Sequence, residues 1–464
     1  MSGIMIAGVS SGSGKTTFTM GLMHILKKKG YNVRAFKTGP DYIDPMFHRH
    51  VLNDQSYNLP LWILKDETVK FLYHGSIKKG DIPIIEGVMG YYDGHSSNTD
   101  FGSSSHLADL LDASVIIMMD ASHMALTAAA LLKGLMEFKT PTKIRGVIFN
   151  NISSHKHYKL LKDAVESHTS IECYGYLEHN RAFEIKSRHL GLMQADEISD
   201  LDQKIDDIGE SIETTVNIQK IIDDCLKVTN QLDDFSPEVY DLERLNKIQN
   251  RLEVQNGLKL GIAMDEAFSF YYDHNIELLK YLGIDLVPFS PINDQFLPDG
   301  CDALYIGGGY PEVFADRLES NESFRGDIKR KIVSGLPVYA ECGGLMYLAD
   351  DIVGLNGERN SMVGFFEAEV QMTSRLQHFG HVEAVLDTEW GELSYRGHEF
   401  HKSIFVPKKN IHTKISVEKD GQFWDCGYSL GNTIATYVHN HFYSNLEFLE
   451  FLVGFWSQNK LRGV

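Results

Sequence analysis

Residues 8–17, GVSSGSGKTT, combine glycines, hydroxyl side chains and one lysine in an order that suits phosphate binding. Backbone N–H groups at a helix N-terminus can bind phosphate oxygens, a lysine adds a mobile charge, and a threonine hydroxyl can reach Mg²⁺. Gly8 lies one residue further from Lys15 than in the common G-x-x-x-x-G-K-[ST] pattern. An apolar run at 4–7 and a helical pattern after the loop still favour a nucleotide site over a flexible glycine turn. The expected nucleotide-binding residues are Gly12, Ser13, Gly14, Lys15, Thr16 and Thr17.

Cys342 follows the run PVYAE and precedes two glycines. This order predicts a buried strand, a sharp turn at the cysteine and a helix that begins at the glycines. A helix N-terminus stabilises a thiolate, so the position suits a nucleophile. The alternative is a buried structural cysteine, the commoner role of a free thiol. His398, His439 and His441 are candidate bases downstream, and His439 comes just after a strand-like run at 433–438, which favours the nucleophile.

Charged side chains gather at the ends of three strand-like runs in the first half of the chain. Carboxylates beside a phosphate site can hold Mg²⁺, which takes few protein ligands, and a lysine can neutralise a transferred phosphoryl group. Each acid alone would suit a turn or a helix N-cap. Their convergence beside one loop favours a functional role, and only Asp120 stays open between the two interpretations. The residues concerned are Lys37, Asp41, Asp44, Glu86, Asp93 and Asp120.

Three consecutive glycines at 307–309 follow another strand-like run. Their backbone N–H groups could face the oxygen of a tetrahedral intermediate. The alternative is an ordinary glycine loop. The expected oxyanion donors are Gly308, Gly309 and Gly343.

Strand-like and helix-like runs alternate in two blocks, which predicts an α/β fold of two doubly wound domains. Such sheets place functional residues at the carboxyl ends of their strands. Residues 200–256 change to acidic amphipathic helix. We expect a phosphate-loop domain at 1–230, a linker at 231–256 and a second domain at 257–464. The strand-like runs are 4–7, 33–36, 82–85, 115–119 and 146–149, then 260–264, 287–289, 303–306 and 338–340.

Composition limits the classes of protein that fit. A chain of 464 residues exceeds what one hydrophobic core usually serves. The net charge of −19 argues against nucleic-acid and acidic-membrane partners. No apolar run reaches transmembrane length, and we expect no cleavable signal, because its removal would destroy the nucleotide loop. The five cysteines are scattered without C-x-x-C spacing, which indicates a cytoplasmic protein without disulfides or a zinc site. The oligomeric state stays open, and a homodimer is compatible with the sequence.

Ten stretches along nearly the whole chain resemble the cobyrinic acid a,c-diamide synthase family. That family joins an ATP-dependent synthetase domain, similar to dethiobiotin synthetase, to a class I glutamine amidotransferase domain of flavodoxin-like fold. The stretches are GVSSGSGKTT, KTGPDYIDP, EGVMGYYDG, RHLGL at 188–192, DEAFSFYY, FSPIND, GGGYPE, YAECGGLMYL, RGHEFH and YVHNHF.

The resemblance implies a role for each matched residue. It makes Cys342 the glutaminase nucleophile and His439 its base, with His441 as the alternative base. It gathers Mg²⁺, ATP and the carboxylate to be amidated at the phosphate loop. The implied catalytic residues are Cys342, His439, Lys37, Asp44 and Asp93; the implied metal ligands are Thr16, Asp41 and Glu86; and the implied substrate contacts include Asp41, Tyr42 and Ile43.

The expected reaction converts carboxylates into amides. ATP would form an acyl phosphate, and ammonia released from L-glutamine would displace phosphate after transfer between the domains. The resemblance names the a and c acetates of a corrin. Hydrogenobyrinic acid and nickel sirohydrochlorin are the alternative tetrapyrroles. A nucleotide switch with an inactive amidotransferase module is the non-enzymatic alternative.

The expected tetrapyrrole carries several carboxylates, although the chain itself is strongly acidic. Local positive groups must therefore attract it. Arginines suit carboxylates because their contacts are bidentate. We expect Arg375 or Arg396 to hold the macrocycle, and the alternative is a solvated or structural role. A second group of positive side chains near the carboxylate loop comprises Arg34, Lys37, His48, Arg49 and His50.

Overall fold

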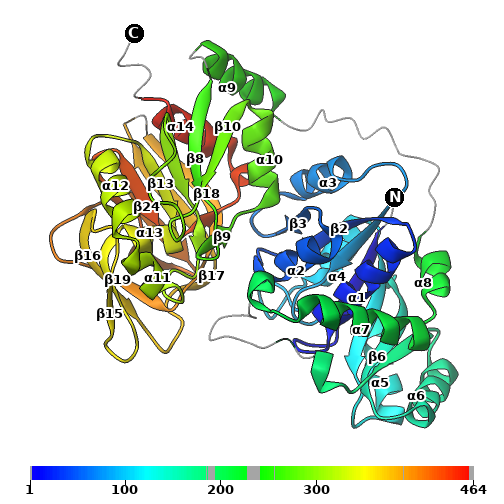
Figure 1. Cartoon of the computed structure of the whole chain (residues 1–464). Coiled ribbons are helices and arrows are strands. Elements are labelled where there is room, and N and C mark those ends of the chain that lie inside the picture. The colour runs from blue at the N-terminus through cyan, green and yellow to red at the C-terminus, as the bar shows by residue number, and fades with distance from the viewer. Residues whose placement is uncertain are drawn as a thin grey trace. The chain divides into compact units, whose positions relative to one another are not determined.

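The computed structural model describes residues 3–183, 185, 194–226, 241–254, 257–389 and 391–458. The chain forms two compact units, Met1–Val239 and Tyr240–Val464 (Figure 1). Both are built from helices around a central sheet, which confirms the predicted α/β class. The stretch 188–192 and residues 231–240, 255 and 256 of the expected linker lie outside the described residues. No helix in the described ranges is both long and apolar enough to cross a membrane.

The first unit contains a seven-stranded sheet in which all neighbouring strands are parallel. Five of its strands contain the five predicted apolar runs, because strands covered on both faces are continuously apolar. In spatial order the strands are β3 (Ser56–Leu59), β2 (Asn32–Thr38), β4 (Asp81–Glu86), β1 (Ile4–Gly8), β5 (Ser114–Asp120), β6 (Ile144–Ile152) and β7 (Glu172–Glu178).

Helices connect these strands, as parallel neighbours require. α1 begins directly after the glycine-rich loop and packs on β1, β2 and β4, while α7 packs on α1. The helices are α1 (Lys15–Lys28), α2 (Ile43–Leu52), α3 (Asp66–Gly75), α4 (Ser104–Leu110), α5 (Leu126–Phe138), α6 (His155–His168), α7 (Leu201–Thr215) and α8 (Ile218–Cys225).

The second unit is centred on a mixed sheet of seven strands. Five are mutually parallel and two add antiparallel at one edge. In spatial order they are β10 (Ile284–Phe289), β8 (Leu258–Ala263), β11 (Ala303–Ile306), β13 (Val338–Glu341), β24 (Thr433–Thr436), β23 (Tyr428–Leu430) and β20 (His412–Thr413). Its helices are α9 (Leu242–Val254), α10 (Asp273–Tyr281), α11 (Ala315–Ser320), α12 (Glu322–Val333), α13 (Gly343–Leu348) and α14 (Leu446–Trp456).

Helix α9 lies in the interval expected to be a linker. Its buried residues Leu245, Ile248 and Leu252 recur at helical spacing and belong to the hydrophobic core of the second unit. The helix also packs on α14. This segment is therefore part of the second unit's core.

Three further sheets of the second unit have no counterpart among the expected strands. A two-stranded sheet joins β12 (Gly308–Gly309) to β9 (Phe268–Phe270). The second has the order β15 (Arg359–Ser361), β14 (Ala349–Val353), β16 (Phe366–Met372) and β19 (Ser403–Pro407). The third has the order β22 (Gln422–Asp425), β21 (Ile415–Lys419), β17 (Phe379–Thr388), β18 (Gly391–Phe400) and β25 (His439–Asn440).

Candidate active sites

The glycine-rich loop links the end of β1 to the start of α1. Gly14 has φ of 94°, and a Cβ atom there would lie 2.2 Å from the side-chain nitrogen of Asn150, so only glycine fits. The Asn150 amide donates to the carbonyl of Ser13 (3.2 Å) and braces the loop. Gly12 also adopts a positive φ of 75°, and Thr17 lies half-buried on α1. The loop thus has the strand–loop–helix form expected of a phosphate site.

Lys15 folds back across this loop. Its ammonium group donates to the carbonyls of Ser10 (3.1 Å) and Met89 (2.6 Å). Burial, together with the positive charge of Lys37, lowers the pKa of Lys15 to about 8. Both of these contacts are to neutral carbonyl oxygens, and a bound phosphate would add a negative charge in direct contact with the ammonium group.

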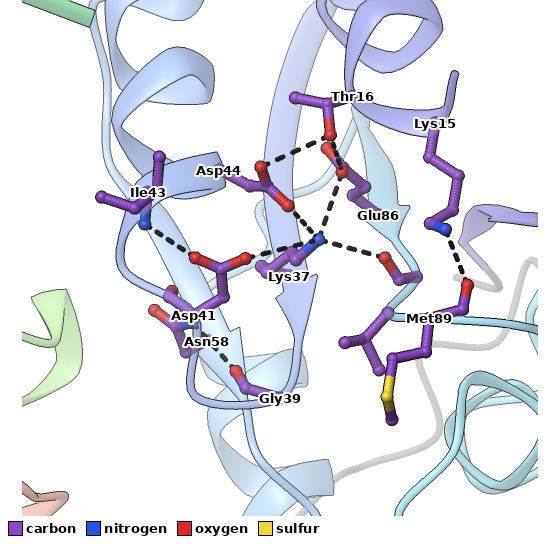
Figure 2. A network of polar contacts seen from close by, with 12 residues as sticks. Lys15, Thr16, Lys37, Gly39, Asp41, Ile43, Asp44, Asn58, Glu86 and Met89 are labelled. Carbon is purple, nitrogen blue, oxygen red and sulfur yellow. Dashed lines mark hydrogen bonds and ion pairs between the residues drawn. The ribbon is translucent and has the colours of Figure 1, made fainter. Parts of the chain in front are cut away.

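A buried lysine and two carboxylates form the centre of the site (Figure 2). Lys37 on β2 and Glu86 on β4 are direct neighbours in the sheet register. The Lys37 ammonium donates to Glu86 Oε1 (3.1 Å), to the Gly87 carbonyl (3.1 Å) and to Asp44 Oδ2. Lys37 is 2% exposed and Glu86 is fully buried, so these charges interact with little screening by water.

The pKa values of the two carboxyl groups beside Lys37 shift in opposite directions. Burial opposes ionisation of Glu86. The charge of Lys37 and the hydrogen bonds that Glu86 accepts nevertheless hold the pKa of Glu86 well below the usual range. Burial and the neighbouring carboxylates of Asp41 and Glu86 raise the pKa of Asp44. Burial alone would lower the pKa of Lys37, but Asp44 and Glu86 raise it. Lys37 therefore keeps its charge, and one carboxyl beside it can carry a proton.

Thr16 brings a hydroxyl to the same two carboxylates. Its Oγ1 donates to Glu86 Oε1 (2.7 Å) and lies 3.4 Å from Asp44 Oδ1. Within the described ranges, no group of three or more His, Cys, Asp or Glu side chains is arranged to hold a metal ion. Mg²⁺ prefers oxygen ligands and takes only one or two carboxylates from a protein, so the hydroxyl and the two carboxylates fit it.

Asp41 lies on the other side of Lys37 from Thr16 (Figure 2). Its Oδ2 is 4.0 Å from the Lys37 ammonium, and its Oδ1 accepts from the backbone N–H of Ile43 (2.8 Å). The structure thus brings Asp44, rather than the expected Asp41, to the Thr16 hydroxyl. Tyr42 caps the start of α2 and is buried together with Ile43.

Asp93 is exposed, and its Oδ2 accepts from the backbone N–H of Gly90 (2.9 Å). Its charge also acts on Lys15. Asp120 accepts from the backbone N–H of Ser122 (3.0 Å) and from the Asn151 amide (2.8 Å). Both bonds are of the turn-stabilising kind, which is one of the two roles that the sequence left open for Asp120.

Among the residues expected near the site, His48 is the one whose observed surroundings differ most from the expectation. It was grouped with positive side chains that would attract substrate, but it is fully buried. Its Nε2 lies 2.7 Å from Glu86 Oε2, and its Nδ1 lies 3.0 Å from Ser56 Oγ. Arg34 of the same group pairs with Asp54 (2.9 Å). Both side chains are committed to partners inside the unit.

In the second unit, Cys342 occupies the sharp turn between β13 and α13. Its φ of 47° and ψ of −101° are rare for a residue with a side chain, and its N–H donates to the Thr436 carbonyl (2.7 Å). A strained turn between a buried strand and a helix is the form that presents a nucleophile above a sheet. The predicted strand, turn and helix are all confirmed.

The surroundings of Cys342 oppose ionisation of its thiol. Burial, and then the carboxylates of Glu312 and Glu399, raise the pKa of the Cys342 thiol. Burial also lowers the pKa of His439 to about 3. These shifts favour a neutral thiol on Cys342 and a neutral imidazole on His439, and a neutral imidazole can accept a proton as a base.

The expected oxyanion glycines and the expected base lie together. A Cβ atom on Gly308 would approach His439 Cε1 to 2.3 Å, and one on Gly343 would approach the Gly309 nitrogen to 3.0 Å. The backbone of these glycines therefore packs directly against the ring and against itself. The Gly307 N–H donates to the Tyr271 hydroxyl (2.7 Å). The N–H group of the first glycine in the run therefore already has a partner.

Glu341, which directly precedes Cys342, was not identified from the sequence. Its carboxyl group accepts from the hydroxyls of Tyr339 (3.0 Å) and Tyr305 (3.1 Å), and its Oε2 lies 4.0 Å from His439 Nδ1. Burial raises the pKa of Glu341 to about 8, although these hydrogen bonds oppose the rise. The signal in the sequence that could have identified Glu341 is its position as a charged residue at the end of an apolar strand.

The two expected substrate arginines are on the surface of the second unit. Arg396 on β18 faces Glu383 on β17 in the sheet register and pairs with it (3.1 Å). Arg375 is exposed in the segment between β16 and β17. Both guanidinium groups can reach solvent.

The chain matches two family models. Residues 4–192 match the CobQ/CobB/MinD/ParA nucleotide binding domain, and residues 259–446 match the CobB/CobQ-like glutamine amidotransferase domain.

Relatives described as cobyrinate a,c-diamide synthase match along almost the entire chain. The protein of Caldanaerobacter subterraneus subsp. tengcongensis is 42% identical, over 96% of this chain and 96% of its own. That of Clostridium acetobutylicum is 41% identical, over 98% of this chain and 100% of its own. That of Listeria innocua is 39% identical, over 96% and 97%.

Proposed function

Because the chain belongs to the cobyrinate a,c-diamide synthase family, we propose that it amidates the a and c acetate carboxylates of cobyrinate, using ATP and glutamine. Relatives with that description match it over nearly their full length. What carries the proposal is the presence, in one chain, of a glycine-rich strand–loop–helix turn beside the buried Lys37–Glu86 ion pair and of a cysteine held in a strained strand–helix turn.

The first unit is proposed to activate the carboxylate. A carboxylate oxygen attacks the γ-phosphorus of ATP, ADP leaves, and an acyl phosphate results; ammonia then attacks the acyl carbon and phosphate leaves. Lys15 and Lys37 offset the charge on the transferred phosphoryl group. Asp41, Tyr42 and Ile43 contact the substrate carboxylate, and Asp93 supports Lys15 through its charge.

Thr16, Asp44 and Glu86 are proposed to hold Mg²⁺, with Asp41 close by. The ion would contribute positive charge beside the phosphates. The protein's own part is to keep Glu86 ionised and to hold the Thr16 hydroxyl against it.

The second unit is proposed to release ammonia from glutamine. His439 takes the Cys342 proton as the sulfur attacks the amide carbon, and it returns that proton to the leaving ammonia. The backbone N–H groups of Gly308, Gly309 and Gly343 stabilise the oxyanion. Water then hydrolyses the thioester to glutamate and restores the thiol. The close approach of Gly308 to His439 and of Gly343 to Gly309 supports this assignment.

The test is product formation by the purified full-length chain. We expect ATP, Mg²⁺, glutamine and cobyrinate together to give a product that carries two amides, identified by mass spectrometry. Hydrogenobyrinic acid and nickel sirohydrochlorin would be assayed alongside, and faster turnover of either would replace the proposed substrate. Nucleotide binding without glutamine hydrolysis would favour the switch alternative.

Arg375 and Arg396 are proposed to bind the peripheral carboxylates of the tetrapyrrole. Their access to solvent supports this, although Arg396 would have to leave Glu383 or bind beside it. Each arginine would be replaced by alanine, and KM would be measured for tetrapyrrole, ATP and glutamine. A selective rise in the tetrapyrrole KM is expected. If that KM is unchanged in both variants, these residues do not belong to the substrate site.

A further inference from the structure

His48 joins Glu86 to the neighbouring strand β3. Both His48 and Glu86 are fully buried. The imidazole spans from Glu86 Oε2, 2.7 Å from Nε2, to the Ser56 hydroxyl, 3.0 Å from Nδ1. A buried ring held at both nitrogens has one orientation, and that orientation fixes the oxygen it contacts.

Helix α2 delivers His48 to this place. Asp44 and His48 lie one helical turn apart and therefore share a face of the helix. Asp44 contacts the Lys37 ammonium, and His48 contacts Glu86, which are neighbours on β2 and β4. One helix face thus holds both members of the buried ion pair.

The two oxygens of Glu86 have different partners. Oε1 receives the Thr16 hydroxyl (2.7 Å) and the Lys37 ammonium (3.1 Å), whereas Oε2 receives His48. An ionised carboxylate only accepts hydrogen bonds, so Nε2 is the donor, and Ser56 can donate its hydroxyl to Nδ1. Rotation of the carboxylate away from Thr16 would break the bond to His48.

We propose that His48 is a positioning residue that holds Glu86 with Oε1 directed at Thr16, and that this orientation sets the affinity of the phosphate loop for nucleotide with Mg²⁺. The inference rests on the proposed Mg²⁺–ATP site. Partners behind a metal ligand typically change metal affinity or activity by about 10–100-fold when removed. His48 touches neither nucleotide nor substrate in this role, so its effect passes through Glu86.

Two polar substitutions separate this role from a merely structural one. The side-chain nitrogen of glutamine can take the place of Nε2, whereas that of asparagine corresponds to Nδ1 and falls short of Glu86. We therefore compare His48→Gln with His48→Asn in the full-length chain. Binding of a fluorescent ATP analogue is measured by anisotropy in Mg²⁺ and in EDTA, and ammonia-dependent amidation is measured in parallel.

We expect His48→Asn to weaken Mg²⁺-dependent nucleotide binding about tenfold or more and to leave binding in EDTA within about twofold. His48→Gln should stay within about threefold of wild type in both media. His24→Gln and His24→Asn, at a partly exposed histidine paired with Asp206 (3.0 Å), are the matched controls and should behave like wild type. Thermal unfolding shows whether His48→Gln and His48→Asn are equally folded.

The inference is overturned if His48→Asn binds like wild type, if both His48 variants lose equally, or if the loss is the same in EDTA. Those outcomes leave the proposed function intact as long as wild type binds nucleotide more tightly with Mg²⁺. If wild type itself gains nothing from Mg²⁺, the proposed metal site fails and the inference fails with it.

Discussion

Glu86 and Glu341 occupy similar places in the two units but have opposite surroundings. Each is the last residue of an interior strand of its central sheet, and each is buried. Glu86 meets an ammonium, an imidazole and a hydroxyl, and its pKa lies below the usual range. Glu341 meets two phenol hydroxyls and a backbone N–H, and burial raises its pKa to about 8.

The difference arises from the neighbouring strand. The register partner of Glu86 on β2 is Lys37, whereas that of Glu341 on β24 is Thr436. A cation beside the first carboxylate compensates its buried charge, whereas the described residues that bond to the second supply two phenol hydroxyls and a backbone N–H. The charged centre suits anionic phosphate chemistry. The neutral centre suits the passage of one proton between a thiol and an imidazole, which releases neutral ammonia.

If the two centres are chemically separate, removal of the cysteine should disable only the neutral one. Cys342→Ala is expected to lower glutamine-dependent amidation by about 10³-fold or more, because the nucleophile is lost. Amidation supported by ammonium salts should stay close to wild type. Product formation with each nitrogen source, measured by mass spectrometry, checks this.

Cys301→Ala is the control for this experiment, because Cys301 is half-buried and lies outside the turn. It should keep both activities. Loss of both activities in well-folded Cys342→Ala would contradict the separation of the two centres.

Removal of the Lys37 ammonium group should show how much stability is lost when the buried carboxylates have no cation beside them. Lys37→Met leaves the carboxyl groups of Asp44 and Glu86 buried without their shared partner. We expect a loss of about 3–5 kcal/mol in stability near pH 7. Unpaired buried carboxylates have folded-state pKa values above the unfolded values, so the loss should shrink as the pH falls toward 5.

Scanning calorimetry at pH 7 and pH 5.5 measures the shift in unfolding temperature. Lys28→Met, at an exposed position on α1, should change stability by no more than about 0.5 kcal/mol. A Lys37→Met variant that loses equal stability at both pH values would mean that charge compensation is not what Lys37 contributes.

Lys15 provides the converse of the cysteine experiment. Lys15→Ala should lower ATP-dependent amidation with ammonium by about 10²-fold or more, since a cation that meets the phosphates is lost. Glutamine hydrolysis should continue, because Cys342 and His439 are untouched. Coupled assays of ADP and glutamate release report the two reactions, and Lys28→Ala is the control. Equal loss of both would show that the centres cannot be varied independently.

Much of the charged centre could be predicted from the sequence. Its residues follow apolar runs that became parallel strands, and parallel strands bring their carboxyl ends to one edge. His48 was misjudged, although a signal existed. Asp44, Phe47, His48 and Val51 share one helix face at spacings of three and four, and all are buried.

The neutral centre was harder to predict. The turn at Cys342 has a local sequence signature, but the partners of Glu341 come from β11, β13 and β25, which are far apart in the chain. No local pattern reports such a set. The sheets after α13 were also missed, although Val382, Ala384 and Leu386 alternate inward along β17 as a half-buried strand requires.

The smallest expected effect tests the neutral centre itself. In wild type the folded-state pKa of Glu341 is about 8 against an ordinary 4.5, so the folded chain holds its proton more tightly than the unfolded chain. Its contribution to stability is complete below the ordinary value and declines as the pH rises toward 8. Glu341→Gln removes this titration while it keeps a similar shape. The free energy of unfolding of the variant, relative to that of wild type, should therefore rise by about 1–2 kcal/mol as the pH goes from 6 to 8.

Unfolding temperatures of wild type and Glu341→Gln at pH 6, 7 and 8 give this difference, and titrations common to both proteins cancel. Glu253→Gln, exposed on α9 of the same unit, should show no such trend. The sign is the decisive point. If Glu341→Gln instead becomes less stable relative to wild type as the pH rises, Glu341 is ionised in the folded state and is stabilised as a charge, as Glu86 is. The two strand ends would then differ in their partners but not in their charge state.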